Sequence, residues 1–330
     1  MTSGLGLPGS SREKFWVYRR ALQTIAARPM LVDRLGLAAT AAIMTCMTAP
    51  QTILFPTDFS GRCDRPRDRA IQLARVWGAK LILLHVLGND AATTVDVQED
   101  IARAETRLRA EVQDDAIAVS TRLAFGDVAQ AIIETSAEFG VDLIVAGISR
   151  HDEIGDFIVG TTVERLAQRG GLPVLIVKER AQQQYRQLMV ATDFSACSAT
   201  ALRLAVAIFP AADLTLLHAY HVRLETLRGR EGPAGDRQAD IARDLETFLE
   251  EADLPAGVRD RLDINVDYGE ICAVARDHVQ SNNTDLAVVG THGRSGLIAA
   301  MLGSTARALL ACLDCDVLLV PQDKDSADRT

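Results

Sequence analysis

A glycine-rich stretch near the carboxyl terminus carries the residues best suited to chemistry. Residues 286–289 are apolar, Gly290 and Gly293 follow, and Gly303-Ser304 comes nine residues later. This order predicts a buried strand, a glycine turn and a helix. Glycine tolerates positive φ and has no Cβ, so its backbone N–H groups can approach an anion, and Ser304 is a good N-cap candidate at the positive end of the helix dipole. The stretch therefore predicts a phosphate cradle, although the same glycines would also fit tight packing alone.

Most of this pattern occurs twice along the chain. The tetrapeptide Thr57-Asp58-Phe59-Ser60 recurs identically at 192–195, and Leu83-Leu84-His85 recurs at 216–218. Four further matches share an offset of 143 residues: Gly126 with Gly269, Gly147 with Gly290, Gly160 with Gly303 and Val174 with Val317. One fold has therefore been duplicated within the chain. We expect a first domain at 47–180 and a second at 187–322, preceded by a leader at 1–46 that is disordered or outside the fold, and followed by a polar tail at 323–330.

Apolar runs alternate with helical patterns in the first copy. The runs predict strands at 52–56, 79–86, 116–123, 142–146 and 173–177. Helices are expected around 70–74, at 98–112, from 128 onward and at 162–169. Strands separated by helices of this length favour a mostly parallel sheet with helices on both faces. The predicted fold class is therefore α/β, with two tandem five-stranded parallel-sheet domains.

In such a sheet, ligands bind beyond the carboxyl ends of the strands, where the strand order reverses. Asp193 follows the first strand of the second copy and Gly290 follows its fourth, so both are expected at that edge. The Asp193 carboxylate could accept hydrogen bonds from ribose hydroxyls or an adenine amine. An N-cap or an Asx turn is the alternative interpretation of this aspartate.

These residues resemble the tandem universal stress protein family over about 47–322. That family has a Rossmann-like sheet, also described as adenine nucleotide alpha hydrolase-like, and one subgroup binds ATP through G-x-x-G-x9-G-[ST]. The second copy satisfies this motif in full with Gly290, Gly293, Gly303 and Ser304. The resemblance implies ATP, with Mg²⁺, as the ligand. It places Ala191, Thr192 and Asp193 at the nucleoside, Ala219 near the adenine, Val289, Gly290, His292 and Gly293 beside ribose and phosphates, and Gly303, Ser304 and Thr305 at the triphosphate.

The first copy departs from the motif. Arg150 stands where the second glycine belongs, although Gly160-Thr161 is intact. If that position requires positive φ, arginine there is strained; otherwise its guanidinium could pair with a phosphate. We expect a weakened or lost nucleotide site, with a weaker set of candidate binding residues consisting of Pro56, Thr57, Asp58, Val86, Gly147, Gly160 and Thr161.

No catalytic or metal-binding residue is predicted. His292 is expected to make a hydrogen bond to ligand or backbone, because the motif holds no second group of general-base type. His85 and His218 follow apolar strands and are expected to be satisfied histidines. Cys312 and Cys315 have the spacing of a redox or zinc pair but no second Cys/His pair nearby, so they are interpreted as structural.

Composition limits the partners and the location. The net charge of −9 argues against duplex nucleic acid, which needs a concentrated basic surface. Six scattered cysteines favour a reducing, cytoplasmic setting. The uncharged run at 35–49 would reach only about 22 Å as a helix, short of the roughly 30 Å hydrocarbon core, so no spanning segment is expected. A targeting or membrane-surface leader stays open.

Three functions remain open at this point. The first is an ATP-binding regulatory or stress-response protein with slow or no hydrolysis, acting through protein partners in stress signalling. The second is an adenylyl- or phosphoryl-transfer enzyme on the same fold, and the third is a nucleotide-free interaction scaffold. Family members pair their last strands across a dimer, so 173–177 and 317–320 are expected to pair within this chain as a pseudo-dimer. A further homodimer is possible.

Overall fold

Two successive sets of strands and helices repeat the same order along the chain. The computed structural model describes residues 49–88, 97–148, 161–169, 171–220, 234–293 and 302–322. The predicted leader and tail, Arg150 and Gly160 lie outside the described residues. The described ranges all belong to one unit, Thr48–Thr330.

The first copy contains five strands, as predicted. Its apolar runs form strands whose side chains are buried on both faces, which is typical of parallel sheets covered by helices. In order, the elements are β1 (Thr52–Pro56), the short 3-10 helix η2 (Gly61–Cys63), α3 (Asp64–Trp77), β2 (Lys80–Leu87), α4 (Val97–Glu111), β3 (Val119–Phe125), α5 (Val128–Phe139), β4 (Leu143–Gly147), α6 (Thr161–Arg169) and β5 (Val174–Val177).

The second copy repeats this order with longer helices around its second crossover. Its elements are β6 (Gln187–Ala191), α7 (Ala196–Ile208), β7 (Asp213–Tyr220), α8 (Ala234–Glu251), α9 (Val258–Arg261), β8 (Asp263–Tyr268), α10 (Ile271–Asn282), β9 (Leu286–Gly290), α11 (Ser304–Cys312) and β10 (Asp316–Val320). Strand β3 begins three residues later than predicted, because Ile117 is held in a turn by its N–H bond to the Asp114 carbonyl, 3.2 Å away.

All ten strands form one sheet, in the order β3-β2-β1-β4-β5-β10-β9-β6-β7-β8. Neighbours within each copy are parallel. Strands β5 and β10 are antiparallel, with Val317 opposite Ile176 and Leu318 opposite Leu175. The predicted pairing of the two last strands is therefore present, and the edge that each copy would otherwise expose is covered.

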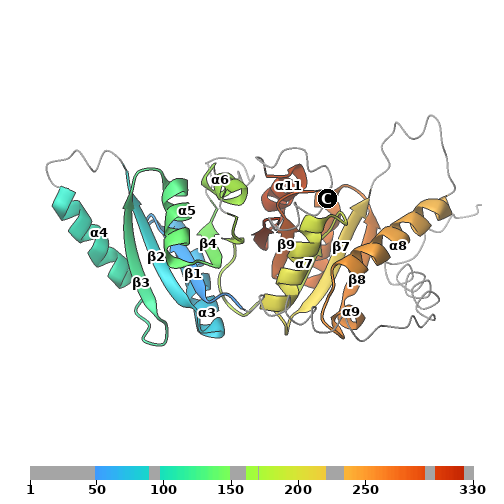
Figure 1. The fold of residues 1–330 in the computed structure, drawn as a ribbon, viewed down its shortest axis with the longest axis horizontal. Helices are drawn as coiled ribbons and strands as arrows, with labels where there is room; N and C mark the ends of the chain where they lie inside the picture. The colour runs from blue at the N-terminus through green and yellow to red at the C-terminus, as the bar shows by residue number, and fades with distance from the viewer. Residues whose placement is uncertain are drawn as a thin grey trace, which may run out of the picture. The chain divides into compact units, whose positions relative to one another are not determined.

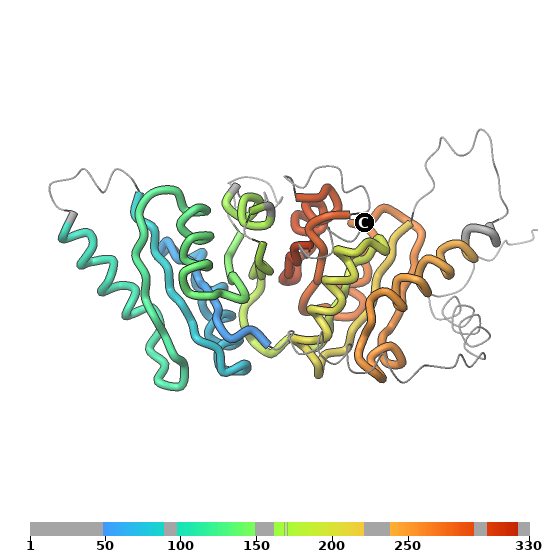
Figure 2. Tube along the Cα trace, in the orientation of Figure 1, coloured from blue at the N-terminus to red at the C-terminus, as the bar shows by residue number. Residues whose placement is uncertain are grey.

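Helices cover both faces of the sheet (Figure 1). Residues of α3, α4, α7 and α8 pack into one buried apolar cluster, and residues of α5, α6, α10 and α11 pack into another. The chain passes from β5 to β6 through residues 178–186 (Figure 2). The strand order reverses between β1 and β4 in the first copy and between β6 and β9 in the second.

A buried polar network fastens the seam between β5 and β10, centred on Asp316, which is fully buried at the start of β10. Its Oδ1 accepts the N–H groups of Lys178 at 2.7 Å and Glu179 at 2.9 Å. Its Oδ2 accepts the Tyr185 hydroxyl at 2.5 Å and lies 3.4 Å from Arg69 Nε, an ion pair without hydrogen-bond geometry. The carboxylate thus joins the second copy to α3 and to the linker.

Lys178 adds a second set of bonds to this seam. Its Nζ donates to the carbonyls of Leu310 and Leu313 at the end of α11, at 2.7 and 2.6 Å. Burial lowers the pKa of Lys178 to about 8, although the neighbouring acidic groups, Asp316 among them, act in the opposite direction. A cation at this end of α11 also complements the negative end of the helix dipole.

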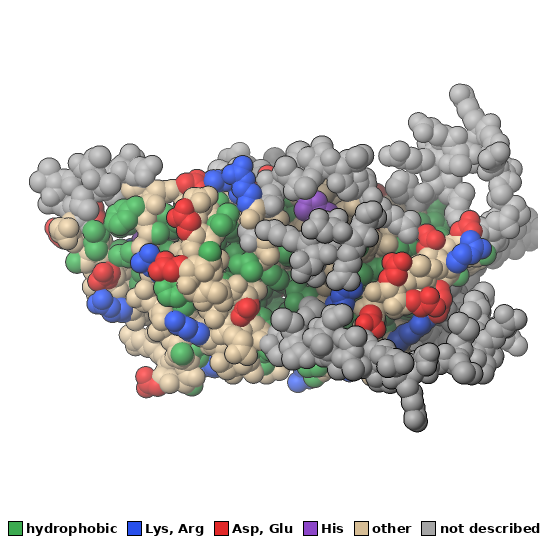
Figure 3. Space-filling model, viewed as in Figure 1, with side chains coloured by type: hydrophobic (Ala, Val, Ile, Leu, Met, Phe, Trp, Pro, Cys, Tyr) green, Lys and Arg blue, Asp and Glu red, His purple; other side chains and the backbone are tan. Residues whose placement is uncertain are grey.

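The described surface carries charges of both signs. In the view of Figure 3, acidic and basic side chains are interspersed over α8 and over the first copy. Among the residues that the structure describes, no helix is both long and apolar enough to cross a membrane.

Candidate functional site

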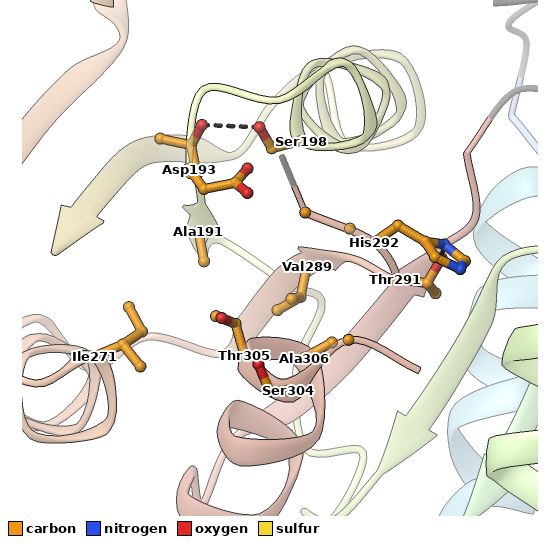
Figure 4. A pocket seen from close by; sticks show the side chains of 14 residues that line it. Ala191, Asp193, Ser198, Ile271, Val289, Thr291, His292, Ser304, Thr305 and Ala306 are labelled. Atoms are coloured by element: carbon orange, nitrogen blue, oxygen red, sulfur yellow. Dashed lines mark hydrogen bonds between the residues drawn. The ribbon is translucent and has the colours of Figure 1, made fainter. Parts of the chain in front are cut away.

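A cavity of about 170 Å³ lies at the carboxyl ends of β6 and β9, where the strand order of the second copy reverses. This is the place where ligands bind in open parallel sheets. Three segments supply the walls: the loop after β6, the loop after β9 and the first turn of α11 (Figure 4). The lining residues are Ala191, Thr192, Asp193, Ser198, Ile271, Val289, Gly290, Thr291, His292, Gly293, Gly303, Ser304, Thr305 and Ala306.

The loop after β6 is a tight corner. The Phe194 N–H donates to Thr192 Oγ1 at 2.9 Å, and the Ser195 N–H donates to Asp193 Oδ1 at 3.1 Å. The second bond is the Asx turn that we considered as the alternative role of Asp193. This role occupies one carboxylate oxygen and leaves the aspartate half-buried in the cavity wall.

Phe194 has a left-handed backbone, with φ of 60°. This conformation is a real outlier for a bulky residue, and it is stabilised by contacts of the ring. The ring stacks on His218, with 4.2 Å between centroids, and His218 Nδ1 lies 2.9 Å from the Thr192 carbonyl oxygen.

The first copy builds the same corner with the same residue types. Phe59 has φ of 61°, and its ring lies 4.3 Å from that of His85. His85 Nδ1 lies 2.8 Å from the Thr57 carbonyl oxygen. The interpretation of His85 and His218 as satisfied histidines is therefore confirmed.

The three motif glycines are required by close packing rather than by positive φ, which none of them adopts. A Cβ on Gly290 would lie 2.9 Å from Cys197 Sγ and 3.1 Å from its carbonyl carbon. A Cβ on Gly293 would lie 2.7 Å from Asp193 Oδ2, and one on Gly303 would lie 3.0 Å from the Thr291 carbonyl oxygen. The expectation that these positions need a left-handed backbone is wrong, and backbone strain gives no reason for glycine at position 293.

The first turn of α11 opens into the cavity without a side-chain cap. Gly303 is the N-cap, with φ of −54°, and no side chain accepts a hydrogen bond from this end of the helix. The prediction that Ser304 is the N-cap is wrong, because Ser304 is the first helical residue. The Ser304 and Thr305 side chains are exposed. Uncapped N–H groups at a helix start favour a negative ligand.

The structure brings ten of the eleven predicted second-copy residues to this cavity. The exception is Ala219, which lies in β7 opposite Asp267 and does not line it. Four lining residues were missed: Ser198, Ile271, Thr291 and Ala306. Thr291 and Ala306 lie within or beside the motif and could have been included, whereas Ser198 and Ile271 reach the cavity only because α7 and α10 begin there.

His292 does not turn its ring toward the cavity. Figure 4 shows the ring directed away from Ala191 and Asp193. Its Nδ1 lies 2.9 Å from Thr291 Oγ1, and its Nε2 is buried with no hydrogen-bond partner among the described residues. This arrangement gives no support to a catalytic role.

The first copy differs at the position equivalent to Ser198, where Cys63 donates its S–H to Asp58 Oδ1 at 3.2 Å. Burial acts to raise the pKa of Asp58, but hydrogen bonds from Ser60 and Cys63 outweigh it and the pKa is lowered. Pro56 and Val86 lie at the ends of β1 and β2, and a Cβ on Gly147 would lie 2.9 Å from Pro66 Cγ. Thr57 is buried, and Thr161 begins α6.

In the described ranges, no three His, Cys, Asp or Glu side chains form a group suited to a metal ion. Cys312 and Cys315 are both free thiols.

A model of the universal stress protein family matches the chain twice, over residues 50–178 and 184–321. A universal stress protein of Mycobacterium tuberculosis is 27% identical over 282 residues, covering 76% of this chain and 92% of that protein. Universal stress protein G of Shigella flexneri is 28% identical over 108 residues, which cover 29% of this chain and 75% of that protein.

Solved structures share the fold. A putative universal stress protein of Pseudomonas aeruginosa superimposes with a TM-score of 0.61 at 23% identity, covering 86% of this chain and 97% of that one. A universal stress protein of Archaeoglobus fulgidus gives a TM-score of 0.60 at 17% identity, covering 83% and 99%.

Proposed function

The chain belongs to the universal stress protein family, and we propose that its second copy binds ATP with Mg²⁺ as the input of a regulatory or stress-response protein. The observation that supports this most is the meeting of Asp193 and the uncapped start of α11 at one cavity. A nucleotide needs both a hydrogen-bond acceptor for its sugar or base and a positive end for its phosphates.

The roles follow from the chemistry of each group. Asp193 Oδ2 can accept from a ribose hydroxyl or an adenine amine while Oδ1 stays in its turn. The N–H groups of the first turn of α11 and the Ser304 and Thr305 hydroxyls can donate to phosphate oxygens. Gly290 and Gly303 let the loops close together enough to form the wall. Mg²⁺ would screen the phosphate charge.

We infer slow or no hydrolysis. The ring of His292 is turned away from Asp193, and no other histidine is among the residues that line the cavity in the described chain. The signal is then carried by the bound state itself, through any difference in affinity between two conformations of the protein. The proposed readers of this state are protein partners in stress signalling.

We propose that the first copy binds nucleotide weakly or not at all. The Cys63 thiol there donates to the aspartate that would otherwise face the ligand. Its motif also carries Arg150 where the second copy has Gly293.

Ser304→Asp in the full chain tests the assignment of the phosphates. A carboxylate at the first helical position stabilises the helix by about 0.3–1 kcal/mol but repels phosphate. The variant should therefore keep or raise the melting temperature without ligand and lose the rise that millimolar Mg-ATP produces in the natural protein.

Thr161→Asp is the matched control, because Thr161 begins α6 at the equivalent position of the first copy. It should retain the nucleotide-induced rise and the calorimetric affinity. Undiminished ATP binding by Ser304→Asp would refute the site. Rapid turnover that is lost in His292→Ala would favour a transfer enzyme, and a melting temperature indifferent to ATP, ADP and AMP would favour a scaffold.

A further inference from the structure

Helices α10 and α11 pack against one another on the same face of the second copy, and each carries a cysteine at the contact. Cys272 lies in the first turn of α10, and Cys312 is the last residue of α11. Arg276, one turn after Cys272, donates its Nε to the Cys312 carbonyl oxygen at 3.2 Å. Because residues four apart share a helix face, the side of α10 that carries Cys272 faces the end of α11.

The two thiols interact directly and remain accessible. Both are free and only partly buried. Burial, and after it the Cys312 thiol and Glu270, raise the pKa of Cys272 to about 12. Cys272 therefore keeps its proton at neutral pH and presents a neutral thiol to the Cys312 sulfur.

The other described thiols are in different surroundings. Cys315 is buried in the sheet, and burial raises its pKa to about 12. Cys197 is buried with its Sγ 3.6 Å from the Val320 carbonyl oxygen, and Cys63 is bonded to Asp58. The partner that the structure gives Cys312 is thus Cys272, forty residues away in the sequence, rather than the nearby Cys315.

We propose that Cys272 and Cys312 form a reversible disulfide when the protein meets a hydroperoxide. Cys312 attacks the O–O bond, so that its thiol and one peroxide molecule become a sulfenic acid and water. The Cys272 thiol then attacks the sulfenic sulfur, the S–OH bond breaks, and a second water leaves with the thiol proton. The two sulfurs lose two electrons in total, and the peroxide gains them. A dithiol reductant reverses the reaction by exchange.

The bond would connect the first turn of α10 to the last turn of α11. Ile271, next to Cys272, lines the cavity, as do Thr305 and Ala306 at the other end of α11. The disulfide would also close a loop of forty residues, which restricts the unfolded chain. Oxidation should therefore raise the melting temperature, by roughly 5 °C or more given the usual effect of such loops.

Peroxide treatment of the full chain, followed by alkylation of remaining thiols and non-reducing peptide mass spectrometry, tests the proposal. The expected product is a linked pair of peptides carrying Cys272 and Cys312, which dithiothreitol removes. Cys272→Ser and Cys312→Ser should each abolish this product and the rise in melting temperature. Cys63→Ser and Cys315→Ser are the controls and should retain both.

Two results would overturn the proposal: a bond between Cys312 and Cys315, or a full rise in melting temperature in oxidised Cys272→Ser. The absence of any disulfide after peroxide treatment would do the same. None of these readouts involves nucleotide, so their failure would leave the proposed ATP site untouched.

Discussion

Replacing Asp316 by asparagine should weaken the seam between the two copies more than its small change in shape suggests. The amide oxygen can still accept the N–H groups of Lys178 and Glu179, so these bonds are retained. The amide nitrogen, however, would face the Tyr185 hydroxyl and Arg69. The charge that balances the buried Arg69 guanidinium would be lost.

The magnitude follows from the surroundings of Arg69. Breaking a buried ion pair by removing one partner costs about 3–5 kcal/mol. Here Arg69 keeps hydrogen bonds to Gln72 Oε1 at 2.6 Å and to the Gln183 carbonyl at 2.8 Å, and it stays 4.2 Å above the Tyr185 ring. We therefore expect the lower end, about 3 kcal/mol of the free energy of unfolding.

Urea unfolding at pH 7, followed by circular dichroism, measures this loss. Asp285→Asn is the matched control, because Asp285 also accepts two backbone N–H groups, those of Arg186 at 2.8 Å and Gln187 at 2.9 Å. Asp285 is only partly buried, so its replacement should cost about 1 kcal/mol. Equal losses in the two variants would refute the reasoning. Adding Arg69→Met to Asp316→Asn should recover part of the loss, since the unpaired buried cation is then gone.

Three further predictions concern single residues. Gly290→Ala should cost about 1–3 kcal/mol in urea unfolding because its Cβ meets Cys197, whereas Gly88→Ala, whose Cβ meets nothing within 4 Å, should be near neutral; equal effects would contradict the packing argument. The folded pKa of Lys178, about 8, lies below the unfolded value of 10.5, so the unfolded chain binds more protons between these values and the contribution of Lys178 to stability rises with pH. The free energy of unfolding of the natural protein minus that of Lys178→Met should increase by roughly 3 kcal/mol between pH 7.5 and 10.5, and a flat difference would show that Lys178 titrates normally. Burial lowers the pKa of His278, so the unfolded chain takes up its proton first as the pH falls below about 6.5, and stability is lost; thermal melts of His278→Gln should lack this part of the acid loss.

The sheet could be predicted closely because buried parallel strands are continuous apolar runs. Residues 286–289 and 52–56 have no polar alternation, and the repeated tetrapeptide located the second copy without any structural knowledge. The pairing of β5 with β10 could also be expected, since each is the last strand of its copy.

The reasons behind the site residues were harder to predict. A glycine in a sequence does not show whether it avoids strain or makes room, and only the distance from Gly290 to Cys197 separates the two. Ala219 was placed at the cavity by resemblance, and the register of β7 places it elsewhere.

Contacts between distant segments left no local pattern. Asp316 gathers Arg69, Lys178 and Tyr185 from three different segments, and Cys272 meets Cys312 across two helices. Such groups are set by tertiary packing, so no spacing in the sequence could have indicated them.

The seam between β5 and β10 also imposes an order on biosynthesis. The first copy is complete once β5 has been made, but the strand that covers its edge is the last one of the chain, about 140 residues later. At roughly 5–20 residues per second, the nascent first copy would wait about 7–28 seconds with an open edge strand. Lys178 and Tyr185 would wait equally long for Asp316. The same interval is when a ribosome-bound chain is most exposed to pairing with a neighbouring copy, so premature termination before residue 316 would leave the sticky half without its cover.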